Sequence, residues 1–209
     1  MAAVSPPIIC NKALNLLRAK RISSLTDDSV NARLCNDIYY LTLEALLMEY
    51  PWSFAQKRVA LATVDETPAF TDDLMTIVYQ KPTDLLKVNF VNQQEAIFKI
   101  EGDKILSDTS SLKIKYTYRN TNPQSYNPDF ITAFATLLAS EMAYAITNSR
   151  TLTEDLVKIY EGIKLPKAMS TDSMQGTPQY PHQNEWLEAR AAGSGGISGQ
   201  SGWSTWYPV

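Results

Sequence analysis

The chain has 209 residues, of which 44% are apolar and 20% charged, a composition typical of a globular protein with one good core or two small ones. Its formal net charge of −3 argues against a protein that binds duplex DNA by neutralising many phosphates with Lys and Arg. The charge does not exclude a protein that merely surrounds DNA. The sequence lacks a run of about 18 apolar residues and the features of a signal peptide, so it predicts neither a membrane span nor secretion.

Residues 1–56 are predicted to form two helices. The motif Ser5-Pro6-Pro7 is typical of a helix start, because Ser can cap the helix and Pro fits where an N–H is not needed. The first helix is expected to end near Lys20. The second is expected to follow Ser29 and to stop at Pro51. The apolar residues expected to face the core are Ile9, Ala13, Leu16 and Leu17 in the first helix, and Val30, Leu34, Ile38, Leu41, Ala45 and Met48 in the second.

From about Lys57 the apolar residues alternate with a period of two, which indicates strands. Gly102-Asp103 has the composition of a tight turn between two of them. No helix is available for crossovers between neighbouring strands, so the sheet is expected to be antiparallel. Strands are predicted around 59–63, 75–79, 85–90, 97–101, 104–107 and 112–118.

Two further helices are predicted after the strands. Asn127-Pro128-Asp129 is expected to cap the third helix, Thr151 or Thr153 is expected to cap the fourth, and Pro166 is expected to kink or end it. The inward residues are expected to be Phe130, Phe134, Leu137, Leu138, Ala145 and Ile146 in the third helix, and Leu152, Leu156, Ile159, Tyr160 and Ile163 in the fourth. The sequence therefore predicts an α+β fold, whose four-helix core (1–56 and 120–168) carries an inserted antiparallel β domain (57–119) and an extended C-terminal tail (169–209).

The tail differs in composition from the rest of the chain. Five of the eight glycines lie between Gly193 and Gly202, and such a Gly/Ser-rich stretch cannot bury enough apolar surface to offset its ordering entropy. Trp186-Leu-Glu-Ala-Arg190 is a short amphipathic island, and Trp and Arg are enriched at interface hot spots. We therefore predict a docking tail with two anchoring groups, one at Trp186 and Arg190 and one at Trp203, Trp206 and Tyr207. For each group the alternative is a chance local patch. The predicted partner-binding residues are Trp186, Arg190, Trp203, Trp206 and Tyr207.

The residues that usually carry catalysis or bind metals are sparse. The only histidine is His182, in the tail, and the glycine-rich segment matches no phosphate-binding loop. Cys10 and Cys35 lie in helical patterns without a Cys-x-x-Cys spacing, so buried, reduced thiols are predicted. Carboxylate pairs such as Asp27-Asp28 are explained by helix capping and turns. The prediction is a protein that is not an enzyme, with no catalytic, cofactor-binding or metal site and no cofactor.

An ordered series of short motifs resembles one known family. The motifs are Tyr50-Pro-Trp-Ser-Phe-Ala55 with the strand Arg58–Ala62, Tyr79–Val88, the strand pair around Glu101-Gly102, Tyr116–Arg119, the apolar pattern from Phe130 to Thr147, and Trp186–Arg190. The series is similar to the tail tubular protein A family, the head-to-tail adaptors of short-tailed bacteriophages. The resemblance covers most of residues 10–190, whereas residues 193–209 match no part of the family pattern.

The resemblance implies a virion structural protein located at the head-to-tail junction. It implies a ring of about twelve copies that joins the portal protein to the tail nozzle and continues the channel for the viral DNA. The ring would enclose the DNA without sequence-specific binding and would not contact a membrane. A mildly acidic chain suits this role, because acidic walls repel phosphates.

Two other function classes remain open at this stage. One is a small hydrolase or ligand-binding module with a pocket between sheet and helices. The other is a nucleic-acid-binding protein that uses a basic stripe, for which the candidates are Arg18, Lys20 and Arg21, or Lys113 and Lys115. Basic residues at a helix end can equally well interact with the C-terminal carbonyls and the helix dipole.

Overall fold

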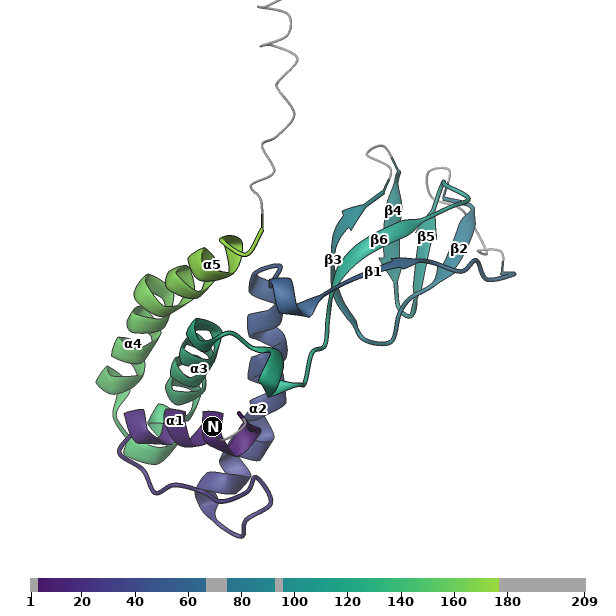
Figure 1. Cartoon of the computed structure of the whole chain (residues 1–209). Coiled ribbons are helices and arrows are strands. Elements are labelled where there is room, and N and C mark those ends of the chain that lie inside the picture. Colours follow the sequence, from purple (N-terminus) through teal and green to yellow (C-terminus); the bar gives the residue numbers. More distant parts are fainter. Residues whose placement is uncertain (1–3, 67–74, 93–95, 177–209) are drawn as a thin grey trace, which may run out of the picture. The chain divides into compact units, whose positions relative to one another are not determined.

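The computed structural model describes residues 4–66, 75–92 and 96–176 of the chain (Figure 1). Within these residues the protein has four helical segments and two small antiparallel sheets. The predicted α+β fold is therefore confirmed.

The two N-terminal helices are α1 (Pro6–Leu16) and α2 (Val30–Glu49). Ser29 caps α2 as predicted, because its hydroxyl accepts a hydrogen bond from the Ala32 amide at 3.2 Å. The α1 helix ends earlier than the predicted Lys20. Arg18 adopts a left-handed conformation with φ 55°, and the amides of Arg18 and Ala19 donate to the carbonyls of Asn15 and Leu14. This pair of bonds is a Schellman motif, which closes the helix.

The third helix is α3 (Pro128–Thr147), which Asn127 caps as predicted through a 2.8 Å hydrogen bond from the Phe130 amide. The α4 helix (Arg150–Ile159) begins one residue before Thr151, the earlier of the two predicted capping residues. Ser149, rather than Thr151 or Thr153, accepts the capping bond, which comes from the Leu152 amide.

A π turn (Tyr160–Lys164) joins α4 directly to α5 (Leu165–Ser173). The Leu165 amide donates to the Tyr160 carbonyl, five residues earlier, so the turn holds one more residue than an α-helical turn. Pro166 therefore lies in the first turn of α5, where a missing N–H is tolerated. The prediction that Pro166 ends the helix is wrong, because the helical path continues through it; the alternative of a kink at Pro166 stays a prediction.

The boundary predicted for the tail is also wrong. The α5 helix continues to Ser173, so residues 169–173 are helical rather than extended. Ala168 and Asp172 are buried there, and Asp172 bonds to Ser53, which explains why the helix persists beyond the predicted end.

Both sheets are antiparallel, as predicted. One has the strand order β1-β6-β3, formed by β1 (Gln56–Ala60), β6 (Lys113–Tyr118) and β3 (Leu85–Val91). The other has the order β2-β5-β4, formed by β2 (Ile77–Gln80), β5 (Lys104–Ser107) and β4 (Phe98–Glu101). Gly102, with φ 60°, occupies the tight turn between β4 and β5, a conformation that favours glycine.

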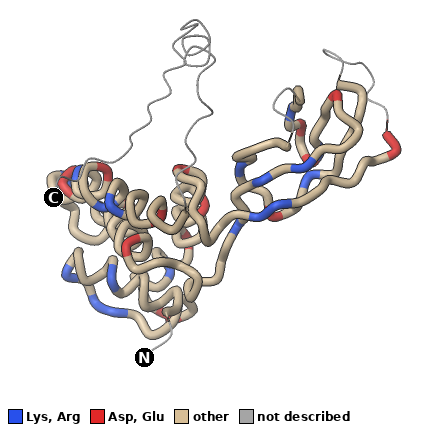
Figure 2. The backbone as a smooth tube through the Cα atoms, turned by 45° about the horizontal axis from the view of Figure 1, so that its top comes forward, with Lys and Arg blue, Asp and Glu red and all other residues tan. Residues whose placement is uncertain are grey.

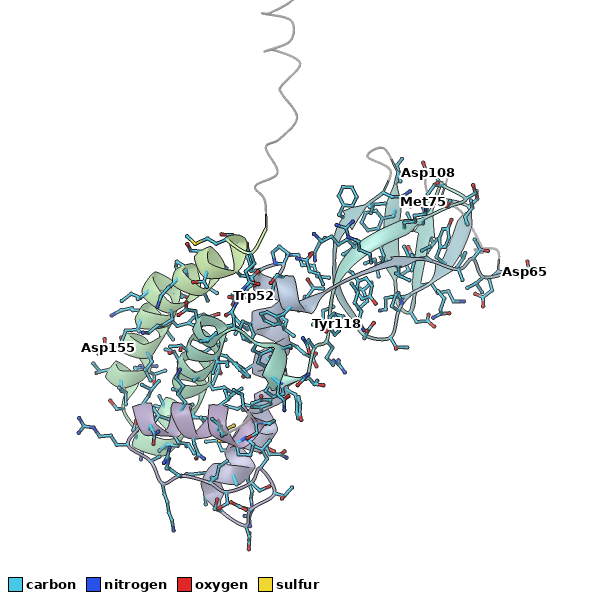
Figure 3. The ribbon with its side chains drawn as sticks, in the orientation of Figure 1. Trp52, Asp65, Met75, Asp108, Tyr118 and Asp155 are labelled. Atoms are coloured by element: carbon cyan, nitrogen blue, oxygen red, sulfur yellow. The ribbon has the colours of Figure 1, made fainter. Side chains whose placement is uncertain are left out.

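Buried apolar residues form two clusters. The larger one joins the helices with Trp52 and Ala55, and the smaller one lies among the strands around Tyr79 and Ile105. Figure 3 shows Trp52 among the helices, where its Nε1 donates to the Leu46 carbonyl at 2.9 Å. Phe130 lies between Trp52 and other rings with centroids about 5 Å apart, a spacing at which edge-to-face aromatic pairs are favourable.

Not every residue predicted to face the core does so. Most of the residues predicted for α1 and α3 are buried or half-buried, but Leu16 and Ala145 are exposed. In the last helix Leu156 and Tyr160 are buried, whereas Ile159 and Ile163 face solvent. Cys10 and Cys35 are buried and reduced, as predicted.

Among the described helices, α3 is the one long and apolar enough to cross a membrane by length and mean hydropathy. Of its most apolar window, 56% is buried inside the protein, where α3 packs against α1, α2, α4 and α5. This burial is what a central core helix shows.

Candidate assembly interface

The α2 helix has two apolar faces. The buried face, which includes Cys35, Tyr39, Leu43 and Leu46, packs into the helical core. On the opposite side lies a second row, called here the outer stripe, which consists of Val30, Leu34, Ile38, Leu41, Ala45 and Met48. These six residues were predicted to face the core; Leu34 and Ile38 pack against the core cluster, and the prediction is wrong for the other four. Val30 is 77% and Leu41 is 71% exposed, Ala45 and Met48 are also exposed, and Leu34 and Ile38 are half-buried.

The outer stripe has the spacing of a surface that packs on another helix. From Leu34 to Met48 its residues recur at alternating intervals of four and three, the heptad seam of helices that pack side by side. Burying one exposed Leu or Val side chain contributes about 1.5–3 kcal/mol. An aligned row of such residues is therefore unfavourable in water, and rows of this kind mark interaction sites.

An acidic edge borders the outer stripe. Asp37 and Glu44 lie seven residues apart, two helical turns along the same side of α2. Glu44 is paired with Arg119 at 2.8 Å, whereas Asp37 makes no ion pair with any described residue.

A second apolar surface lies on the last helical segment. Ile159 and Ile163, four residues apart, are 39% and 58% exposed. Lys158 is next to them, and its side chain is 75% exposed. Figure 1 shows α3 between α2 and α4, and α3 contacts both. The two apolar surfaces therefore belong to helices on opposite flanks of α3.

The β insertion also exposes apolar side chains. Phe90 on β3 and Ile97, Phe98 and Ile100 at β4 reach solvent. β4 is an edge strand of its sheet, and all four of its residues are exposed.

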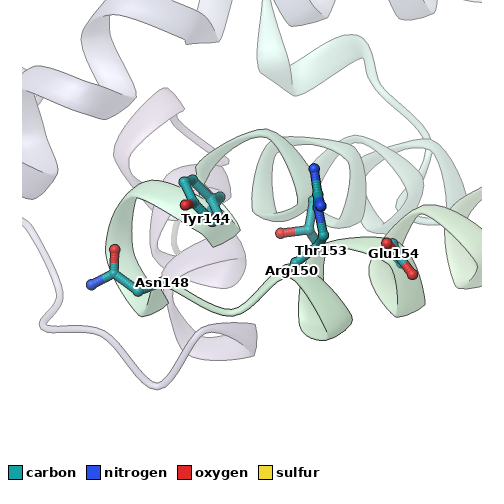
Figure 4. Close-up of a pocket in the computed structure, with 5 residues that line it drawn as sticks. All are labelled: Tyr144, Asn148, Arg150, Thr153 and Glu154. Carbon is teal, nitrogen blue, oxygen red and sulfur yellow. The ribbon is translucent and has the colours of Figure 1, made fainter.

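Two hollows lie in the helical part of the chain. The larger, of about 600 Å³, lies where α3 turns into α4 and is lined by Tyr144, Asn148, Arg150, Thr153 and Glu154 (Figure 4). The smaller, of about 380 Å³, is lined by the loop before α2 and the first turns of that helix. Both hollows are lined by helices and their loops rather than by the sheets.

Charged residues of both signs are interspersed along the described chain (Figure 2). Arg18, Lys20 and Arg21 are exposed after the end of α1, and Lys113 and Lys115 lie on β6. Arg18 belongs to the motif that closes α1, so a local structural role accounts for its place. Residues 4–66, 75–92 and 96–176 contain no group of three or more His, Cys, Asp or Glu side chains that could hold a metal ion.

The partner-binding residues predicted from sequence all lie in residues 177–209, outside the described part of the chain. They are Trp186, Arg190, Trp203, Trp206 and Tyr207. Their roles stay predictions. The outer stripe of α2, by contrast, was visible in the sequence as a helical apolar pattern but was assigned to the wrong side of the helix.

A scan against models of known protein families found no match for this chain. A search of the curated proteins also found no similar protein. The resemblance to the adaptor family therefore enters only as a proposal.

Proposed function

We propose that this protein is a head-to-tail adaptor of a short-tailed bacteriophage, a virion structural protein whose copies form a ring between the portal and the tail nozzle. The observation that carries the proposal is the outer stripe of α2. Four of its six residues, Val30, Leu41, Ala45 and Met48, are exposed, and a ring subunit needs an exposed apolar surface of this kind to bind its neighbour.

The rigidity of α2 favours a stable contact between subunits through the outer stripe. The α2 helix is fixed from its other side by Tyr39, Leu43 and Leu46, which are fully or almost fully buried. Its outer face is thus presented on a rigid element, and little ordering entropy is lost when a partner packs on it. The exposed apolar residues at β3 and β4 are candidates for contact with the next tail component.

The charge distribution is compatible with a wall around DNA. Acidic and basic residues are interspersed along the described chain (Figure 2), and the net charge of the whole chain is −3. Few phosphates would be neutralised by such a surface, so DNA could slide past it.

The main alternative is a small hydrolase or ligand-binding module. Its best site would be the hollow at the turn from α3 to α4. Tyr144, Asn148, Arg150 and Glu154 at its lining are all exposed, whereas binding pockets bury most of a ligand's surface. The outer stripe of α2 has no role in this alternative.

The test is the mass of the purified full-length protein, alone and mixed with a portal ring from the same source, by multi-angle light scattering. We expect assemblies of many copies, formed alone or on the portal. Leu41→Asp should prevent them, because the change places a charge in the middle of the stripe. Leu16→Asp is the control, since Leu16 is an exposed leucine on α1, 46% exposed against 71% for Leu41. A wild-type protein that stays monomeric in both conditions would refute the proposed function.

A further inference from the structure

We propose that the outer face of the β1-β6-β3 sheet binds single-stranded nucleic acid, with its cations on the phosphates and the ring of Phe90 against an unpaired base. The inference goes beyond the proposed function and does not depend on it, because the surface is complete within one copy of the chain.

The three strands of this sheet are basic (Figure 1). They contain no Asp or Glu, and their five cationic residues are Lys57, Arg58, Lys87, Lys113 and Lys115. The rest of the chain carries a formal net charge of −8, because it holds 14 of the 19 Lys and Arg residues and all 22 Asp and Glu residues. Positive charge is therefore concentrated on one sheet of a chain that is otherwise acidic.

The strand register gathers four of these cations on one face. Arg58 on β1 pairs with Lys115 on β6, and Lys113 lies two residues before Lys115. Lys87 on β3 pairs with Thr117, two residues after Lys115. Residues two apart in a strand share a face, so all four cations lie on the same side of the sheet. The alternate residues of β6 belong to the buried apolar cluster, which makes the cationic side the outer face.

This arrangement is unfavourable for the isolated subunit. Arg58 lies directly opposite Lys115, and like charges opposite each other on neighbouring strands destabilise a sheet. The side chains of Arg58, Lys113 and Lys115 form no ion pair or hydrogen bond with any residue of the described ranges. Lys115 is half-buried, and the other three cations of the face are exposed. A partner with several negative charges would remove the repulsion.

A β-bulge adds an aromatic ring to the same face. Val88 packs on the buried side of the sheet, and regular alternation would place Phe90 there too. The register shifts between these two residues, so that Phe90 pairs with Lys115 instead and is 60% exposed. Asn89, the extra residue, donates from Nδ2 to Thr117 Oγ1 at 2.8 Å, which holds the bulge in place. Bulges often redirect a side chain near a functional site.

The combination of cations and ring selects the partner. Arg58, Lys115 and Phe90 form one row across three strands, about 10 Å wide, so they meet the same molecule. A nucleotide offers both a phosphate and the flat face of a base, and proteins that bind single strands combine cations with aromatic rings in this way. An acidic peptide offers carboxylates without a ring.

Duplex DNA fits this face less well than a single strand. Its bases are already stacked on one another, so Phe90 gains little from it, and duplex DNA can still slide through a ring. The assignment of Phe90 to nucleic acid leaves the exposed residues Ile97, Phe98 and Ile100 at β4 as the apolar surface for the next tail component.

Fluorescence anisotropy of the full-length protein with a labelled, mixed-sequence DNA strand of about 16 nucleotides tests the proposal. We expect binding whose logarithmic salt dependence has a slope of about −3, because each of four neutralised phosphates contributes about −0.7. The same DNA as a duplex should bind about tenfold more weakly, because it offers no unpaired base. Poly-glutamate should displace the labelled strand far less well than unlabelled single strand does.

Single substitutions separate the ring from the cations. Phe90→Ala should weaken single-strand binding about tenfold and leave the salt slope unchanged, because a stacked base is lost but no phosphate contact. Lys113→Gln should reduce the slope by about 0.7. Tyr144→Ala and Lys20→Gln are the matched controls, since Tyr144 is an aromatic residue that is 62% exposed and Lys20 is an exposed lysine, both outside the sheet. Neither control should change the affinity or the slope.

Several results would overturn the inference. They are a wild type that does not bind the single strand, a duplex that binds equally well or better, and a Phe90→Ala variant with unchanged affinity. Displacement by poly-glutamate as effective as by single strand would identify an acidic protein as the partner instead. Far-UV circular dichroism checks folding, and Phe90→Leu, which removes the ring but keeps an apolar side chain, repeats the test if Phe90→Ala lowers the melting temperature. The proposed function is tested by the mass of assemblies, so either proposal can fail while the other stands.

Discussion

Asp172 should be the residue of α5 whose loss destabilises the protein most. Asp172 is only 4% exposed, and its carboxylate accepts hydrogen bonds from the Ser53 amide and the Ser53 hydroxyl, both at 2.8 Å, and from Asn127 Nδ2 at 3.4 Å. These bonds join the end of α5 to the segment after α2 and to the cap of α3. We predict that Asp172→Ala lowers the free energy of unfolding.

The size of the effect follows from the two short bonds. A hydrogen bond to a charged group contributes about 1.5–3 kcal/mol, and a donor left without a partner adds to the loss. Ser53 is itself exposed, so water replaces part of what the carboxylate supplied. The Asn127 cap of α3 survives, because its Oδ1 still accepts from Phe130. We therefore expect a loss of about 2–3 kcal/mol.

Urea unfolding followed by circular dichroism measures this loss. Ser173→Ala is the matched control, because Ser173 is exposed and its hydroxyl bonds only to the Ser170 carbonyl of its own helix. The control should change the free energy of unfolding by less than about 0.5 kcal/mol. Asp172→Asn, which keeps one carbonyl acceptor, should fall between the two. If Asp172→Ala is no worse than the control, the carboxylate does not fasten α5 and the reasoning fails.

Three further predictions concern other parts of the chain. Arg18→Gly should stabilise the protein by about 0.5–1 kcal/mol, because glycine adopts the left-handed conformation at the end of α1 without strain; an unchanged melting temperature would contradict this. Burial and then the Asp84 hydrogen bond raise the pKa of Tyr116 to about 12, so its ultraviolet titration should lie above that of an exposed tyrosine, and Asp84→Asn should lower it. The stabilisation from neutral Tyr116 is then present below the ordinary tyrosine pKa of about 10 and is lost as the pH rises through about 12. A chain that ends after Gly176 should keep a cooperative unfolding transition, whereas one that ends after Lys167 should lose stability together with most of α5; equal melting temperatures would show that α5 adds nothing.

Local signals in the sequence predicted most of the elements correctly. Proline directly after the N-cap position identified the starts of α1 and α3, and Gly102 identified the hairpin turn. The Ser5 side chain, however, makes no capping hydrogen bond, unlike that of Asn127. These features depend on a few neighbouring residues, so a sequence displays them directly. Pro166 was misread because its effect depends on the preceding π turn, which leaves no comparable local pattern.

The side of α2 that faces the core could not be read from periodicity alone. The residues of its two apolar faces repeat with the same helical period. Which face is buried depends on the packing of the neighbouring helices. Tyr39, Leu43 and Leu46 fill the space beside these helices, and Val30, Leu41, Ala45 and Met48 of the outer stripe are left exposed. The sequence therefore displays the apolar pattern of the candidate interface, but only the fold shows on which side of α2 that pattern lies. The end of the helical core was missed for a similar reason, since Asp172 gains its partner, Ser53, from a distant part of the chain.

The π turn fixes which side of the last helix faces the core. Successive residues of an α-helix are about 100° apart around its axis, so removing one residue between Tyr160 and Lys164 would rotate everything that follows by about that angle. Ala168 and Asp172 would then leave the core side together. The segment should accept changes of length only in steps close to a whole turn, such as three or four residues. Related chains with a shorter or longer last helix should therefore differ there by a turn at a time, and a change of a single residue should require a new partner for Ser53.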